Sequence, residues 1–217
     1  MNFQFILSRL PFLLQGTLLT LQLTVITLIL GTFLGIVLAF CKISKNIVAN
    51  TFSTIYIWIF RGTPLLLQLA FFYSALPFIG SGIKLDAFQA AVIGLSLNCA
   101  AYMSEIIRGG ILAIDKGQFE ASKSLGFTYF QTMTKIILPQ TFRVIIPPVG
   151  NEFISMLKDT SLVSSIAMTE LMRTSSNIAS ATFKYPEMYF SAACLYLLLT
   201  TIFTVAFSSI EKKLSRY

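Results

Sequence analysis

Histidine is absent from this sequence, and charged residues are scarce. None of the 217 residues is histidine, and only 12% are aspartate, glutamate, lysine or arginine. The first absence excludes catalysis and metal ligation by imidazole in this chain. A soluble domain is about 25% charged, so a chain that is 55% hydrophobic with so little charge has too little polar surface for a soluble fold. We therefore expect an integral membrane protein.

Motifs of enzymes and nucleotide-binding proteins are also lacking. The cysteines, Cys41, Cys99 and Cys194, lie far apart in or beside apolar runs, which is not the spacing of a metal or redox site. Neither G-x-x-x-x-G-K-[ST] nor G-x-S-x-G occurs, so no P-loop and no hydrolase nucleophile is predicted. The 16 lysines and arginines against 9 acids are typical of loops that fix membrane topology. We expect no enzyme, no bound metal or cofactor, and no nucleic-acid partner.

Long apolar runs predict an all-α fold with five transmembrane helices in a single domain, residues 1–217. A bilayer core requires about 20 apolar residues, and the runs that can cross it are residues 12–40, 49–79, 87–107, 136–157 and 189–208. Residues 1–11 are expected to form a short amphipathic segment that is broken at Pro11. Gly31 and Gly35 are spaced for close contact with another helix.

The second span contains a charge beside a helix-weakening sequence. Arg61 is followed by Gly62, Thr63 and Pro64, and proline cannot donate a backbone hydrogen bond. Charges and irregular backbone within a membrane are tolerated only where they are buried in protein or line a wet cavity. We interpret Arg61 and Pro64 either as part of a gate or as structural, with Arg61 capping carbonyl groups that the kink frees.

The third and fourth spans supply the candidate substrate site. Pro147, Pro148 and Gly150 predict an interruption in the fourth span, and interrupted spans indicate transporter substrate sites. Two carboxylates follow on one predicted helical face, where burial requires a cation; that cation is either a ligand or a structural partner such as Arg61. An amide in the middle of the third span also needs a partner. The candidate residues are Asn98, Glu152, Ser155, Met156 and Asp159.

Positive charge predicts the orientation in the membrane. The loops after the first and third spans and the C-terminal tail carry nine lysines and arginines, against five on the other side. Because cytoplasmic loops carry the excess of positive charge, we expect the polar segment 108–135 and the C-terminus in the cytoplasm and the N-terminus outside.

Residues 120–139, EASKSLGFTYFQTMTKIILP, interrupt the apolar runs with an ordered pattern. Its positions are Glu120, Ala121, Ser122, Gly126, Ile136, Leu138 and Pro139. This spacing resembles the E-A-A loop of ABC-importer permeases, with Ser122 in place of the second alanine. Together with RGTPLLLQL in the second span and KDTSLV at 158–163, it resembles the permease subunit of a polar amino acid ABC importer of the histidine, glutamine and arginine type. A channel or an ATP-independent carrier would not account for the E-A-A pattern.

The resemblance implies a type I ABC-importer permease in a prokaryotic cell membrane. Its E-A-A segment would form a cytoplasmic coupling helix on a pair of ATPase subunits, which bind ATP and Mg²⁺. An extracytoplasmic binding protein would deliver the amino acid, and a second permease copy or a sister chain would complete the pair, with a homodimer expected. The two carboxylates favour a basic amino acid, arginine, lysine or histidine; glutamine or another polar amino acid is the alternative.

Overall fold

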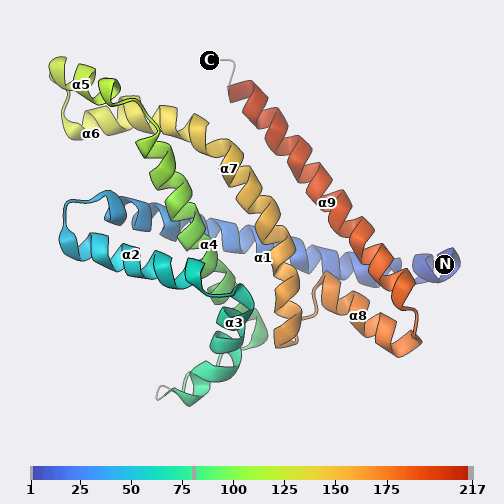
Figure 1. Cartoon of the computed structure of the whole chain (residues 1–217). Helices are drawn as coiled ribbons and strands as arrows, with labels where there is room; N and C mark the ends of the chain where they lie inside the picture. Colours follow the sequence, from blue (N-terminus) through green and yellow to red (C-terminus); the bar gives the residue numbers. More distant parts are fainter. Residues whose placement is uncertain (1, 80–81, 215–217) are drawn as a thin grey trace.

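The computed structural model describes residues 2–79 and 82–214, and these residues form helices and turns with no strand among them (Figure 1). The predicted all-α class is therefore confirmed. The first helix, α1 (Phe3–Ile43), runs unbroken through Pro11, so the break expected there is wrong. Proline removes a single hydrogen bond near the beginning of this helix. The packing of α1 along α4 (Ala87–Leu112) outweighs that loss.

Gly31 and Gly35 bring α1 close to α4, as the sequence predicts. A Cβ atom on Gly31 would lie 2.6 Å from the Cys99 Sγ atom, and one on Gly35 would lie 2.7 Å from the Met103 Cβ atom. Any residue with a Cβ atom at these two positions would overlap with α4. The contact buries Cys99 and Met103 almost completely, so the two glycines fix the central helix pair of the fold.

The second predicted span is divided at its Gly-Thr-Pro sequence. Its parts are α2 (Ile47–Gly62), α3 (Leu65–Ala70), a π-helical turn η1 (Phe71–Ala75) and a 3-10 turn η2 (Leu76–Phe78). The chain bends by 102° between α2 and the part that begins with α3. Pro64 lies at the bend with extended dihedral angles, so the predicted weak point is a full break.

A polar connection and a long helix follow α4. The elements are α5 (Lys116–Ser124), α6 (Tyr129–Thr132), a π-helical turn η3 (Met133–Ile137) and α7 (Leu138–Asp159). The interruption expected at Pro147, Pro148 and Gly150 is wrong, because α7 is continuous there. Neighbouring helices support the prolines. Gly150 instead permits contact with α9 (Tyr185–Leu214), since a Cβ atom there would lie 2.9 Å from Phe207 Cγ.

The segment between α7 and α9 is folded rather than an open polar loop. It contains a 3-10 helix, η4 (Thr160–Ile166), and α8 (Leu171–Thr182), which packs on α1 and α9. The buried Glu170 carboxylate caps α8, accepting from the N–H groups of Met172 at 2.8 Å and Arg173 at 2.7 Å. The Tyr196 hydroxyl of α9 donates to the same carboxylate at 2.9 Å. These hydrogen bonds fix α8 against the long helices.

Three helices in the described part of the chain are long and apolar enough to cross a membrane, or up to four if the bent α2–α3 pair is one span. The three are α1, α4 and α9; α7, which carries four charged side chains, is not among them. Five spans therefore stay a prediction. Large apolar side chains are exposed on the outward faces of several helices, among them Phe33, Trp58 and Leu197. This is expected for surfaces that face lipid.

The long helices cross obliquely, with α1 passing behind α4 and α7, and with α5 and α6 at one end of the molecule (Figure 1). Contacts join α3 to α4 and to η4, and α4 to α7. This arrangement brings the bend after α2 to the middle of α4 and the last two turns of α7.

Candidate functional site

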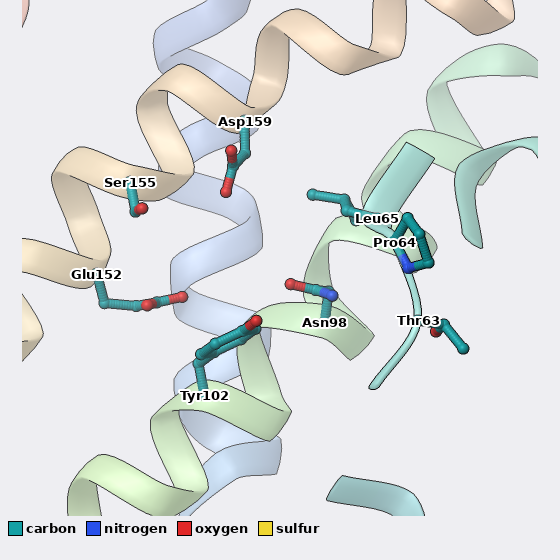
Figure 2. A pocket seen from close by; sticks show the side chains of 8 residues that line it. All are labelled: Thr63, Pro64, Leu65, Asn98, Tyr102, Glu152, Ser155 and Asp159. Carbon is teal, nitrogen blue, oxygen red and sulfur yellow. The ribbon is translucent and has the colours of Figure 1, made fainter. Parts of the chain in front are cut away.

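A cavity of about 260 Å³ lies where the bend between α2 and α3 meets α4 and α7 (Figure 2). Its lining residues are Thr63, Pro64 and Leu65 at the bend, Asn98 and Tyr102 on α4, and Glu152, Ser155 and Asp159 on α7. Pockets for drug-sized ligands measure roughly 300–1,000 Å³, so this cavity suits a smaller molecule. Broken helices beside such cavities are typical of transporter substrate sites.

Two side-chain amides stabilise the bend. A broken helix leaves carbonyl groups without partners, here those of Phe60 and Thr63. The Gln68 Nε2 atom donates to the Phe60 carbonyl at 2.9 Å and to the Thr63 carbonyl at 3.1 Å. The Asn98 Nδ2 atom donates to the Phe60 carbonyl at 3.1 Å and to Gln68 Oε1 at 3.0 Å. Gln68 and Asn98 therefore make the contacts that one interpretation of the sequence assigned to Arg61.

The contacts of Asn98 determine what it can offer a ligand. Its amide nitrogen has two hydrogens, and both are donated to the bend. Its oxygen makes no hydrogen bond in the described part of the chain and points toward the cavity in Figure 2. Asn98 can thus accept a hydrogen bond from a ligand, but it has no free hydrogen to donate to one.

Glu152 and Asp159 project from α7 into the cavity (Figure 2). They are roughly 10 Å apart along the helix axis. None of the hydrogen bonds or ion pairs among the described residues involves either carboxylate or the Ser155 hydroxyl between them. Two acidic side chains therefore face a partly buried space with no protein partner, which favours a cationic ligand.

Met156 is the predicted site residue that the structure does not bring to the cavity. It is 1% exposed and belongs to the buried core. Successive residues of a helix point about 100° apart, so Ser155 and Met156 cannot both face the same cavity. The structure therefore places Asn98, Glu152, Ser155 and Asp159 together and Met156 behind them.

Arg61 pairs with neither cavity carboxylate. Its Nη1 atom lies 4.0 Å from Glu105 Oε2, and its Cζ atom lies 5.1 Å from the centre of the Tyr102 ring. Glu105 is paired with Arg108, with nitrogen–oxygen distances of 3.0 and 2.8 Å. Arg61 therefore lies beside Tyr102, which lines the cavity, and is itself not a lining residue.

The E-A-A segment forms a short helix that ends in a tight turn. Glu120 and Ala121 are exposed on α5. Gly126 follows α5 with a φ of +78°, and the next N–H, of Phe127, donates to the Ser122 carbonyl at 3.0 Å. This is the usual end of a helix at a left-handed glycine.

Ser122 departs from the family pattern for a reason that the structure shows. Its side chain is buried, and its hydroxyl accepts a hydrogen bond from the Thr132 hydroxyl at 3.0 Å. This bond ties α5 to α6. Ile136 and Leu138 pack on the buried cluster at this end of the molecule, and Pro139 lies in the first turn of α7, where no backbone donor is needed.

Sequence reasoning missed three residues that line the cavity, Thr63, Leu65 and Tyr102. Thr63 and Leu65 flank Pro64, so the predicted helix break could have identified them as lining residues. Tyr102 lies four residues after Asn98, and residues at this spacing share a helical face.

Comparison with known proteins gives the family. The family model described as "Binding-protein-dependent transport system inner membrane component" matches residues 31–216. The putative glutamine transport system permease protein GlnP of Rickettsia typhi is 43% identical over 206 residues, covering 95% of this chain and 94% of that protein. The arginine transport system permease protein ArtQ of Bacillus subtilis is 42% identical over 214 residues, covering 99% and 97%.

Solved structures show the same fold. The crystal structure described as an amino acid ABC transporter with histidines has a TM-score of 0.93 and 38% identity, covering 98% of this chain and 99% of that one. The methionine transporter MetNI, in an inward-facing conformation, has a TM-score of 0.79 at 18% identity over 95% and 98%, which supports the fold alone. The predicted type I ABC-importer permease fold is confirmed. The chain therefore belongs to the family of inner membrane components of binding-protein-dependent transport systems: it is a membrane-embedded ABC-transporter permease subunit and not an enzyme, with the ATPase on a separate subunit.

Proposed function

We propose that this permease subunit carries a basic amino acid, arginine, lysine or histidine, into the cell through the cavity between α3, α4 and α7. The observation that carries the proposal is the pair of carboxylates, Glu152 and Asp159, that face this cavity and form no ion pair among the described residues. An unpaired buried carboxylate costs several kcal/mol. A substrate that brings its own positive charge removes that cost when it binds.

The lining offers complementary groups for each end of such a substrate. The side-chain cation would meet Glu152, and the α-ammonium group would meet the free Asn98 oxygen with Asp159 nearby. The hydroxyls of Ser155 and Tyr102 make no hydrogen bond in the described part of the chain, so both can donate to the substrate carboxylate. Because α7 is continuous, it provides no broken helix end whose backbone N–H groups could bind that carboxylate.

Glutamine is the second candidate. Relatives of this chain carry that name, including the protein of Rickettsia typhi that is 43% identical. The amide nitrogen of glutamine could donate to Glu152, and its amide oxygen could accept from Ser155. Such a substrate would leave the second carboxylate without a cation, which is why we favour the basic substrate.

Replacement of Glu152 by glutamine tests the proposal. We expect Glu152→Gln to weaken arginine binding about tenfold or more, which corresponds to about 1.4 kcal/mol, and to leave glutamine binding little changed. Dissociation constants are measured with radiolabelled arginine and competing glutamine on the purified permease–ATPase complex. The binding protein is omitted because it would impose its own preference.

Glu211→Gln is the matched control, since this carboxylate lies on α9 outside the cavity. It should leave both constants unchanged. Tighter binding of glutamine than of arginine by the wild type, together with no effect of Glu152→Gln, would contradict the basic substrate and favour glutamine.

The partners of the family are an ATPase and a substrate-binding protein, and we infer the surfaces that they contact. The E-A-A segment exposes large apolar side chains in α6 and the turn before it: Leu125 is 75%, Tyr129 70% and Phe130 74% exposed. An apolar group of this kind requires a partner surface. We assign this surface to the ATPase, which binds ATP and Mg²⁺, and place it in the cytoplasm with the C-terminus.

The opposite surface contains η4 and α8, and we assign it to the extracytoplasmic binding protein. Arg173 and Lys184 lie on this surface, and the N-terminus would be on the same side of the membrane. A second copy of this chain, or a sister chain, would complete the translocation path.

A further inference from the structure

The carboxylate of Glu105 lies at the centre of a cluster of cations from three helices. Arg108 of α4 holds it with two hydrogen bonds, and Lys42 of α1 lies 3.3 Å away. Arg61 of α2 is the third cation, at the longer distance of 4.0 Å and without a hydrogen bond. Three positive charges thus share one negative charge, and Arg61 is the most weakly held of them.

Arg61 also contacts Tyr102, a residue that lines the proposed substrate cavity. Its guanidinium group lies over the Tyr102 ring, and this ring lines the cavity together with Glu152. The Glu152 carboxylate lines the same cavity from α7, and no ion pair among the described residues joins it to Arg61. The Arg61 side chain is 44% exposed, so it has room to move. It therefore lies beside Glu105 and beside Tyr102, a residue that shares the cavity with Glu152.

We propose that Glu105 is a positioning residue for substrate selectivity, because it holds Arg61 away from Glu152 and so keeps the cavity negative for a cationic substrate. This inference rests on the proposed function, since Glu152 is there the partner of the substrate cation. If Arg61 turned to Glu152, it would neutralise that carboxylate and compete with the cationic side chain of the substrate. A neutral polar substrate would not meet this competition.

Loss of the Glu105 charge would remove the ion-pair partner of Arg61, and the remaining cations would then repel Arg61. Lys42 and Arg108 would remain as cations without a carboxylate between them. Glu152, which lines the cavity together with Tyr102, would then be a negative charge available to Arg61. The break at Gly62 directly after Arg61 places the arginine at a helix end, where its backbone is not held by a following turn.

Glu105→Gln tests the inference through the ratio of arginine to glutamine affinity of the permease–ATPase complex. We expect this ratio to fall about fivefold, which corresponds to about 1 kcal/mol, the upper end for a partly exposed ion pair. The double variant Arg61→Gln/Glu105→Gln should restore the wild-type ratio, because the competing cation is gone. Arg108→Gln, which removes another partner of Glu105 but leaves Arg61 paired, should not lower the ratio.

Recovery of the affinity ratio in the double variant distinguishes a positioning role of Glu105 from damage to the fold. A damaged fold would not recover its selectivity when a further ion-pair residue is removed. An unchanged ratio in Glu105→Gln, or a lowered ratio that persists in the double variant, would overturn the inference. The readout is the change in the ratio, whatever its wild-type value. Failure of the proposed function is distinguished from this by a wild-type preference for glutamine and by the lack of an effect of Glu152→Gln.

Discussion

Asn98 and Gln68 form a side-chain hydrogen bond of 3.0 Å between α4 and α3, at the wall of the cavity that Asn98 lines. The same two amides bind the Phe60 carbonyl at the end of α2. The break in this span is thus stabilised by one side chain from α3 and one from α4. Because the Asn98 nitrogen donates both of its hydrogens to the bend, only its oxygen can bind a group in the cavity. The conformation of the bend therefore determines which hydrogen bonds the site can make.

Gln68→Leu is expected to destabilise the subunit. The substitution leaves one hydrogen of the buried Asn98 amide without its partner and removes a hydrogen bond to the Thr63 carbonyl. A buried unsatisfied group costs about 1–3 kcal/mol. We expect a lower midpoint of thermal unfolding in detergent and weaker arginine binding, since Asn98 would then be free to turn. Gln4→Leu, at an exposed position of α1, is the control for adding an apolar side chain. Equal midpoints for the two variants would contradict the role assigned to Gln68.

Local chemistry made parts of this fold and site predictable from the sequence. Pro64 beside Gly62 weakens any helix, and the chain breaks there. Gly126 is suited to the left-handed conformation that ends α5. Glu152 and Asp159 are seven residues apart, so a continuous helix presents both on one face. Each of these features depends on residues that are close together in the sequence, so a single sequence is enough to predict it.

Features that depend on distant residues were not predictable. Pro11 and the pair Pro147–Pro148 resemble Pro64 in the sequence, yet α1 and α7 pass through them. Packing against other helices decides these cases, and a single sequence does not reveal it. The donor role of Asn98 toward the bend likewise depends on Gln68, 30 residues earlier.

The close contact of α1 with α4 predicts opposite effects for two glycine substitutions. Gly35→Ala places a Cβ atom 2.7 Å from the Met103 Cβ atom and 3.1 Å from the Ala100 carbonyl oxygen. Overpacking of this kind costs about 1–3 kcal/mol, so the thermal midpoint should fall. Gly109→Ala, on α4, meets no atom within 4 Å and should be neutral or stabilising by up to about 1 kcal/mol. A midpoint for Gly35→Ala at or above that of Gly109→Ala would show that the contact is looser than described.

The turn after α5 supplies a test of coupling to the ATPase. Gly126 has a φ of +78°, and a Cβ atom there would meet nothing within 4 Å, so conformation rather than space limits the residue. A leucine would be strained by about 1–2 kcal/mol in this region, whereas asparagine tolerates it. Gly126→Leu should therefore shift the exposed α6 side chains away from α5, and Gly126→Asn should not.

We expect Gly126→Leu to insert into the membrane normally but to lose assembly with the ATPase or stimulation of ATP hydrolysis by the loaded binding protein. Gly126→Asn should keep most of both activities, because it adds a side chain at the same exposed place without the strain. The measurements are co-purification of the ATPase and ATP hydrolysis in proteoliposomes. Arginine binding to the permease serves as the check on folding, since the cavity is at the bend before α3. Figure 1 shows α3 well away from α5 and α6. Normal assembly, transport and stimulated hydrolysis in Gly126→Leu would show that the E-A-A turn does not carry the signal between the ATPase and the helices that line the cavity.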